Sequence, residues 1–95
     1  MAIQSAGEFE VTLSSALLSL DRMLNEAPNN ATLLQVRRSL GQVYALIRRK
    51  EPFTQKHVAA LATAADAMRT AGDDPDMPDR LFDLRDYLEQ QHLPT

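Results

Sequence analysis

The chain has 95 residues, enough for one domain, and carries a net charge of −3 at pH 7 with a pI near 5.2. It contains no Cys, which excludes a disulfide framework and a thiolate metal site. No apolar run approaches the roughly 20 residues that cross a bilayer, and the first residues lack the features of a signal peptide. The sequence therefore predicts one soluble, cytoplasmic domain over residues 1–95, without a membrane partner.

The first helix is predicted to begin at a capping box formed by Ser5 and Glu8. In this motif the hydroxyl accepts an N–H of the first turn and the carboxylate reaches back to the preceding backbone. Apolar residues then follow at steps of three and four, which is the spacing of one helix face: Phe9, Leu13, Leu17, Leu20 and Leu24. Pro28 ends this segment because proline disfavours helix in the residue before it.

A second helix is predicted to begin near Asn29 or Asn30, since both are good caps. It has the cleanest periodic signal in the chain, carried by Leu33, Val36, Leu40, Val43 and Ile47. Gly41 lies inside it, where glycine costs about 1 kcal/mol against alanine. We expect Gly41 to allow close packing against a neighbouring helix; the alternative is close approach of a partner's backbone.

The third and fourth helices are separated from their neighbours by proline-containing breaks. The third is predicted to begin at Thr54 and to end at Gly72, which suits the left-handed position after a helix. The fourth begins around residues 76–78, where proline is tolerated in the first turn. The apolar stripes are Val58, Leu61, Ala65 and Met68 in the third helix and Leu81, Leu84 and Leu88 in the fourth. No segment alternates as a strand does. The fold class is therefore all-α, a compact antiparallel bundle of about four helices.

Acidic residues concentrate in the last quarter of the chain. Seven of the 13 carboxylates lie between Asp73 and Glu89 against two arginines, a net charge of −5 in a protein of −3. Asp79, Asp83 and Asp86 stand at steps of four and three, which places them on one helix face. Three interpretations of such a face are open: it is solvated, it recognises a cationic partner, or it supports acid–base chemistry. Of the two functional interpretations, we favour recognition of a cationic partner over catalysis.

Residue types that carry catalysis or bind metals are dispersed. His57 and His92 are far apart, and the serines have no histidine near them in sequence. No glycine-rich loop is present that would cradle a phosphate. The sequence therefore predicts that the protein is not an enzyme, with no catalytic residues, no metal site and no cofactor.

A basic cluster lies along the second predicted helix and at its end: Arg37, Arg38, Arg48, Arg49 and Lys50. Three interpretations are open. The last three complement the negative end of the helix, or the cluster pairs internally with the acidic helix, or it contacts nucleic acid. The acidic pI and the lack of interleaved aromatic residues weigh against nucleic acid as a partner.

Several pieces of the chain together resemble a known family. They are Leu20-Asp21-Arg22-Met23-Leu24 followed by Pro28, Leu33-Leu34 continuing to Leu40, Val43 and Ile47, and Asp74-Pro75 before Met77, Leu81 and Asp86-Tyr87. In this order and with these loop lengths the chain resembles the small helical immunity proteins that protect bacteria from type VI secretion toxins. The likeness is to those paired with NAD(P)-glycohydrolase effectors of Pseudomonas, and it covers about three quarters of the chain, from near Ser15 to Leu88.

The resemblance implies a stoichiometric inhibitor that binds a cognate effector toxin domain and occludes an active site acting on a nucleotide such as NAD(P) or ATP. Clefts for phosphates are electropositive, so five carboxylates are expected to take the place of phosphates: Asp73, Asp74, Asp76, Asp79 and Asp83. Tyr44 and Tyr87 are candidate aromatic anchors, with partial burial in the bundle as the alternative.

Other functions compete with this one. A helical adaptor or secretion chaperone would hold a partner helix in a groove, and a small regulator would associate with nucleic acid. The periodic second helix would also serve a homodimer.

Overall fold

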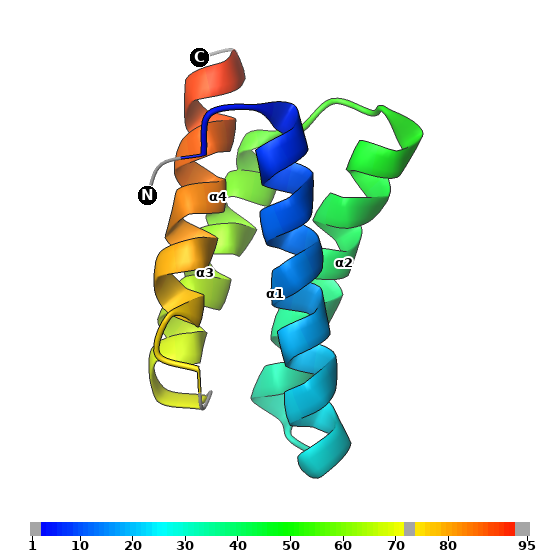
Figure 1. Ribbon diagram of the computed structural model, residues 1–95, viewed down its shortest axis with the longest axis vertical. Coiled ribbons are helices and arrows are strands. Elements are labelled where there is room, and N and C mark those ends of the chain that lie inside the picture. The colour runs from blue at the N-terminus through cyan, green and yellow to red at the C-terminus, as the bar shows by residue number, and fades with distance from the viewer. Residues whose placement is uncertain (1–2, 72–73, 93–95) are drawn as a thin grey trace.

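The computed structural model describes residues 3–71 and 74–92. Within them the chain forms four α-helices that run alternately in opposite directions: α1 (Ala6–Glu26), α2 (Ala31–Arg49), α3 (Gln55–Ala71) and α4 (Met77–His92) (Figure 1). Each helix packs against the next one in the chain, and α1 also packs against α4, which closes the ring. The predicted all-α antiparallel bundle is confirmed, and the two described ranges contain no strand.

The first two helices begin at the side-chain caps that the sequence predicts. Ser5 Oγ accepts the N–H of Glu8 at 3.1 Å, and Glu8 Oε2 accepts the N–H of Gln4 at 3.1 Å. Asn30 Oδ1 accepts the N–H of Leu33 at 3.1 Å. Because the first N–H groups of a helix have no partner within the helix, these acceptors satisfy donors that would otherwise depend on water.

The turn between α2 and α3 uses a different device. Lys50 ends α2 in the left-handed conformation, with φ 57° and ψ 36°. Thr54 then precedes α3, and its N–H donates to Nδ1 of His57 at 3.0 Å. The imidazole thus replaces the carboxylate of a capping box. It also meets the Phe53 ring edge-on, with the ring centroids 6.2 Å apart. The predicted end of α3 at Gly72 lies outside the described residues.

The core is aliphatic and is built from the predicted stripes, as the buried residues show. They include Phe9, Leu13, Leu17 and Leu20 from α1, Leu33, Val36, Leu40 and Val43 from α2, Val58, Leu61, Ala65 and Met68 from α3, and Leu81, Leu84 and Leu88 from α4. Leu24 and Ile47, at the ends of two stripes, are partly buried. The periodic face of α2 is therefore occupied by the protein's own core and is not presented to a second copy.

Gly41 does not have the role that its position suggests. A Cβ built on Gly41 would meet Nη1 of Arg37, on the same helix, at 3.1 Å, and no described atom of a neighbouring helix lies within 4 Å. The expected close packing of another helix against Gly41 is therefore wrong. The Arg37 side chain covers this position because its Nε reaches Asp21 on α1 at 2.8 Å.

Candidate functional site

The two charged regions of the chain lie on helices at opposite corners of the ring. The bounds of α2 enclose four arginines and no carboxylate. The segment from Asp74 to Glu89 has six carboxylates and two arginines, and most of it belongs to α4. Because α2 packs against α1 and α3, and α4 packs against α3 and α1, the basic and acidic helices are diagonal to each other. The molecule is therefore polarised across the bundle.

Two arginines of the basic helix pair with α1. Arg37 Nε lies 2.8 Å from Asp21 Oδ1, and Arg48 Nη1 lies 3.8 Å from Glu10 Oε1. In the described part of the chain no ion pair joins α2 to α4, so the interpretation that the basic cluster pairs with the acidic helix is wrong. The physical reason is the order of the helices around the ring, which places α1 between them.

Asp74 shapes the turn that leads into α4. Its Oδ1 accepts the N–H of Asp76 at 2.9 Å, and its Oδ2 accepts a hydrogen bond from Arg80 Nη1 at 3.4 Å. Its backbone carbonyl accepts the N–H of Met77 at 3.2 Å. An aspartate that bonds a backbone N–H two residues on is a common way to fix a turn. Asp74 is thus a turn-forming residue, whereas it was predicted only as a partner contact. Asp73 lies outside the described residues.

Further acidic residues lie on the outward face of α4 and just before its start. Leu81, Leu84 and Leu88 are fully buried, so the helical period turns Asp79 and Asp86 to solvent. Asp86 Oδ1 lies 2.7 Å from Arg85 Nη2. We define the α4 acidic face as Asp76, Asp79, Asp83 and Asp86. Within the described residues Asp79 has no ion pair, and both Asp76 and Asp79 are exposed.

Two arginines at the contact between α3 and α4 stack on an aromatic ring. Arg69 of α3 and Arg85 of α4 both lie over the ring of Phe82, with their Cζ atoms 5.1 and 4.8 Å from its centroid. A guanidinium stacks well on an aromatic face. Phe82 and Arg85 lie on the side of α4 that meets α3. The charges of Arg69 and Arg85 therefore lie beside the α4 acidic face.

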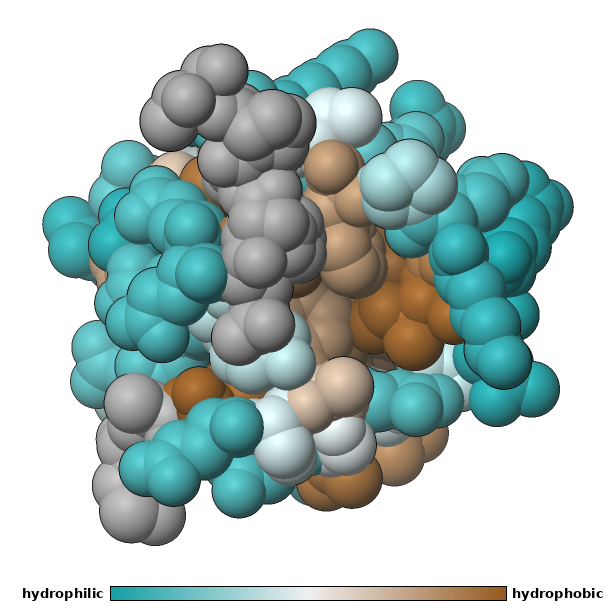
Figure 2. All heavy atoms as spheres, turned by 90° about the horizontal axis from the view of Figure 1, so that it is seen from above, coloured by the Kyte–Doolittle hydropathy of each residue, from teal (hydrophilic) through white to brown (hydrophobic). Residues whose placement is uncertain are grey.

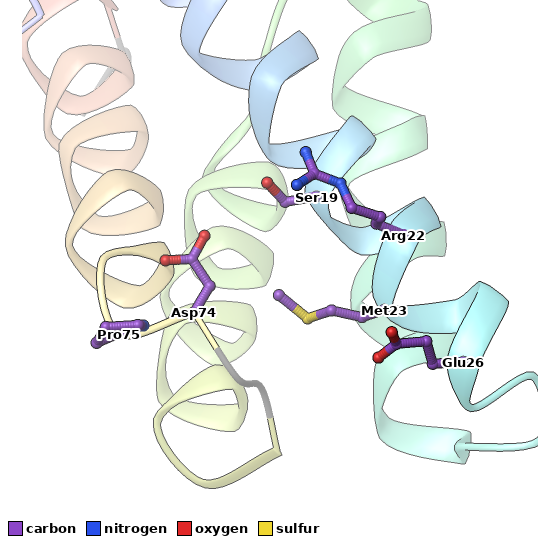
Figure 3. A pocket seen from close by; sticks show the side chains of 6 residues that line it. All are labelled: Ser19, Arg22, Met23, Glu26, Asp74 and Pro75. Atoms are coloured by element: carbon purple, nitrogen blue, oxygen red, sulfur yellow. The ribbon is translucent and has the colours of Figure 1, made fainter.

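A pocket of about 340 Å³ opens next to Asp74, between α1 and the α3–α4 connection. Its lining residues are Ser19, Arg22, Met23, Glu26, Asp74 and Pro75 (Figure 3). Met23 projects across it toward Asp74, while the Arg22 side chain lies along α1 toward Ser19 (Figure 3). The pocket mixes both signs of charge.

Tyr87 lies away from the first turns of α4. Its ring is 5.2 Å from that of Phe9, which in turn meets the Phe53 ring edge-on at 6.0 Å. These aromatic residues line a hollow at the end of the bundle where α1 begins and α4 ends. Figure 2 looks onto this end and shows hydrophobic surface surrounded by hydrophilic side chains. Tyr87 therefore joins α4 to α1.

Tyr44 is partly buried against the core on α2, the helix diagonal to α4. The six described residues among those predicted to bind a partner thus do not form one surface. Asp74, Asp76, Asp79 and Asp83 are neighbours around the start of α4, but the two tyrosines lie elsewhere. Both are partly buried in the bundle, which was the alternative interpretation.

Sequence reasoning missed two surface features. A groove of about 410 Å³ runs between α2 and α3, and its lining is mostly small: Ala31, Thr32, Gln35, Val36, Ser39, Ala60, Thr63, Ala64 and Ala67. The abundance of alanine in the third helix was the available signal. The second feature is a set of large apolar side chains in solvent, Val11, Leu18 and Leu34, which are 69, 65 and 49% exposed.

None of the described helices combines the length and apolarity needed to cross a membrane. Among the residues that the structure describes, no group of three or more His, Cys, Asp or Glu side chains is arranged to hold a metal ion. Comparisons with protein-family models, with curated proteins and with solved structures find no match.

Proposed function

We propose that this protein is an immunity protein, and that its α4 acidic face binds a cognate type VI secretion toxin domain and occludes the toxin's active site. The observation that carries the proposal is the exposure of Asp76, just before α4, and of Asp79 in its first turn, where Arg80 is bonded to Asp74 and Asp79 has no ion pair among the described residues. Such a face offers carboxylates where a toxin acting on NAD(P) or ATP would hold phosphates. No cofactor and no nucleic acid is part of this mechanism.

In the proposed mechanism, electrostatic attraction raises the rate of association with the toxin. Opposite charges on two surfaces steer their encounter and raise association rates well above the neutral range. In this bundle the arginines of α2 lie on the diagonal helix, so they weaken the field at the α4 acidic face less than they would from a neighbouring helix. Screening shortens the reach of exposed charges to about 8 Å at physiological salt. The proposed mechanism therefore requires association that slows as salt is added.

The fold also pre-organises the contact. Asp74 fixes the turn before α4 through the Asp76 N–H and the Arg80 guanidinium, and α4 is anchored in the core by Leu81 and Leu84. A face that is already ordered loses little conformational freedom on binding. A small helical domain then presents Asp76 and Asp79 at one end without rearrangement.

The test is co-expression with the candidate toxin domain encoded beside this protein's gene, scored by growth. The protein should restore growth, and the double variant Asp76→Lys/Asp79→Lys should lose protection while remaining folded. Glu51→Lys/Asp66→Lys is the matched control, because it reverses two exposed carboxylates outside the α4 acidic face and changes the net charge by the same amount. Equal protection by all three proteins would contradict binding through the α4 acidic face, and no protection by any would contradict neutralisation of that toxin.

The groove between α2 and α3 favours a second candidate, a helical adaptor or secretion chaperone. Small residues on both walls, such as Ser39 and Ala60, would let a partner helix approach closely. Ala60→Trp would fill this groove and abolish partner binding under this proposal. The same substitution should leave toxin neutralisation by the α4 acidic face intact.

A further inference from the structure

The outer face of α1 carries a second regular stripe, opposite the buried one. Five residues at steps of three, four, three and four are all exposed; we call them the α1 seam: Glu8, Val11, Ser15, Leu18 and Arg22. Val11 and Leu18 are 69 and 65% exposed, the two largest values among the large hydrophobic residues that the structure describes. They flank a shallow hollow that also includes Ser14 and Ser15. A strip with this spacing is the pattern by which one helix packs along another.

The α1 seam is complementary to a second, antiparallel copy of itself. When two copies of α1 run antiparallel with Ser15 opposite Ser15, Val11 of each copy faces Leu18 of the other. Glu8 of each copy then faces Arg22 of the other. A two-fold axis at Ser15 thus forms two apolar contacts and two ion pairs from a single helix, which is the self-complementarity that an isologous interface requires.

The size and charge of the seam residues agree with this arrangement. Ser15 is small, so the helix axes can approach closely at the crossing. A parallel pairing would instead place Arg22 against Arg22 and Glu8 against Glu8, and like charges at an interface are repulsive. Both charged residues are available for such pairs. In the described part of the chain Arg22 makes no ion pair, and only Oε2 of Glu8 is bonded, to the Gln4 N–H.

We propose that the protein forms a symmetric homodimer through the antiparallel α1 seam, with a second copy of this chain as the occupant. The seam from Glu8 to Arg22 spans about 21 Å of helix. A single pair of crossing helices falls below the roughly 1,200 Å² of stable complexes, so the dissociation constant should be roughly micromolar or weaker. The α4 acidic face is not part of the seam, and the dimer leaves it open.

Sedimentation equilibrium from about 1 µM to about 1 mM measures the association directly. The native protein should shift from monomer to dimer, and Leu18→Glu should weaken the dimer about tenfold or more because it places a carboxylate in the apolar contact. Leu34→Glu is the matched control, an exposed leucine on α2 outside the seam. A native protein that stays monomeric throughout overturns the proposal, as does a dimer that responds equally to both substitutions.

Charge exchange tests the antiparallel register. Arg22→Glu and Glu8→Arg should each weaken the homodimer, since each creates two like-charge pairs. An equimolar mixture of the two variants should recover dimers, because both ion pairs form again between unlike chains. Recovery confined to the mixture supports the register, and two variants that dimerise as well as the native protein overturn it.

The absence of cysteine allows a further test by crosslinking. Ser15→Cys places one thiol beside the two-fold axis and should form an interchain disulfide quickly under mild oxidation. Thr63→Cys, an exposed position on α3, should crosslink slowly. Equal rates for the two variants would overturn the proposed axis. These outcomes are independent of toxin neutralisation, which depends on the α4 acidic face.

Discussion

Replacing Asp74 should destabilise the fold through the turn before α4. In Asp74→Ala the Asp76 N–H loses an acceptor at 2.9 Å, and Arg80 loses a partner at 3.4 Å. A hydrogen bond to a charged group contributes about 1.5–3 kcal/mol, less here because the bond is exposed. The ion pair contributes at most about 1 kcal/mol, since the two side chains are 36 and 22% exposed. We expect a loss of about 1–2 kcal/mol in the free energy of unfolding.

Asp74→Asn separates the two contributions. Asparagine keeps Oδ1 as an acceptor for the Asp76 N–H but loses the charge that attracts Arg80. It should cost less than about 1 kcal/mol. Thermal and urea unfolding, followed by far-ultraviolet circular dichroism, measure both variants. For a domain of this size Tm falls by about 4–8 °C per kcal/mol, so Asp74→Ala should lower Tm by about 5–15 °C.

Equal destabilisation by Asp74→Asn and Asp74→Ala would contradict the turn-forming role of Asp74, because the charge and not the turn would then dominate. Unchanged unfolding curves for both variants would contradict this role as well. Asp79→Ala serves as the control for removing one acidic charge from the first turn of α4. It should change the free energy of unfolding by at most about 1 kcal/mol, the contribution of a carboxylate near a helix N-terminus.

Substitutions at three further positions test the description of the fold. Leu20→Ala should cost about 2–5 kcal/mol in urea unfolding because Leu20 is fully buried; a cost below about 1 kcal/mol would place it outside the core. Ser5→Ala should cost about 0.5–2 kcal/mol through loss of the α1 cap, whereas Ser5→Asn should retain most of it. Gly41→Ala should stabilise by up to about 1 kcal/mol, since only the flexible Arg37 side chain must shift by a few tenths of an ångström; a lower Tm would show that Arg37 is rigidly held.

The fold was largely predictable from local patterns. The caps at Ser5 and Asn30 and the four apolar stripes gave the number of helices, their approximate starts and most of the core. These features depend on residues within a few positions of each other, where helix geometry fixes which side chains meet. Gly41 was misread because a glycine inside a helix does not reveal whether a neighbouring helix or its own side chains lie over it.

The candidate site was less predictable because its geometry depends on distant residues. Charge counts do not reveal that α2 and α4 lie diagonally across the bundle. They also do not reveal that both carboxylate oxygens of Asp74 accept hydrogen bonds from residues at the start of α4. The position of Tyr87 beside Phe9 depends on how α1 meets α4. The α1 seam, in contrast, was visible in the spacing of Val11 and Leu18. It was missed because the stronger stripe through Leu13 and Leu20 already explains why α1 is apolar, as a helix that packs on the core.

The most direct test of the central proposal is hydrogen exchange of the complex with the neutralised toxin domain, compared with the free protein. Binding through the α4 acidic face predicts slower exchange in residues 74–83, and loss of this protection in the Asp76→Lys/Asp79→Lys variant. Protection confined to α2, with exchange in the first turns of α4 unchanged, would contradict it.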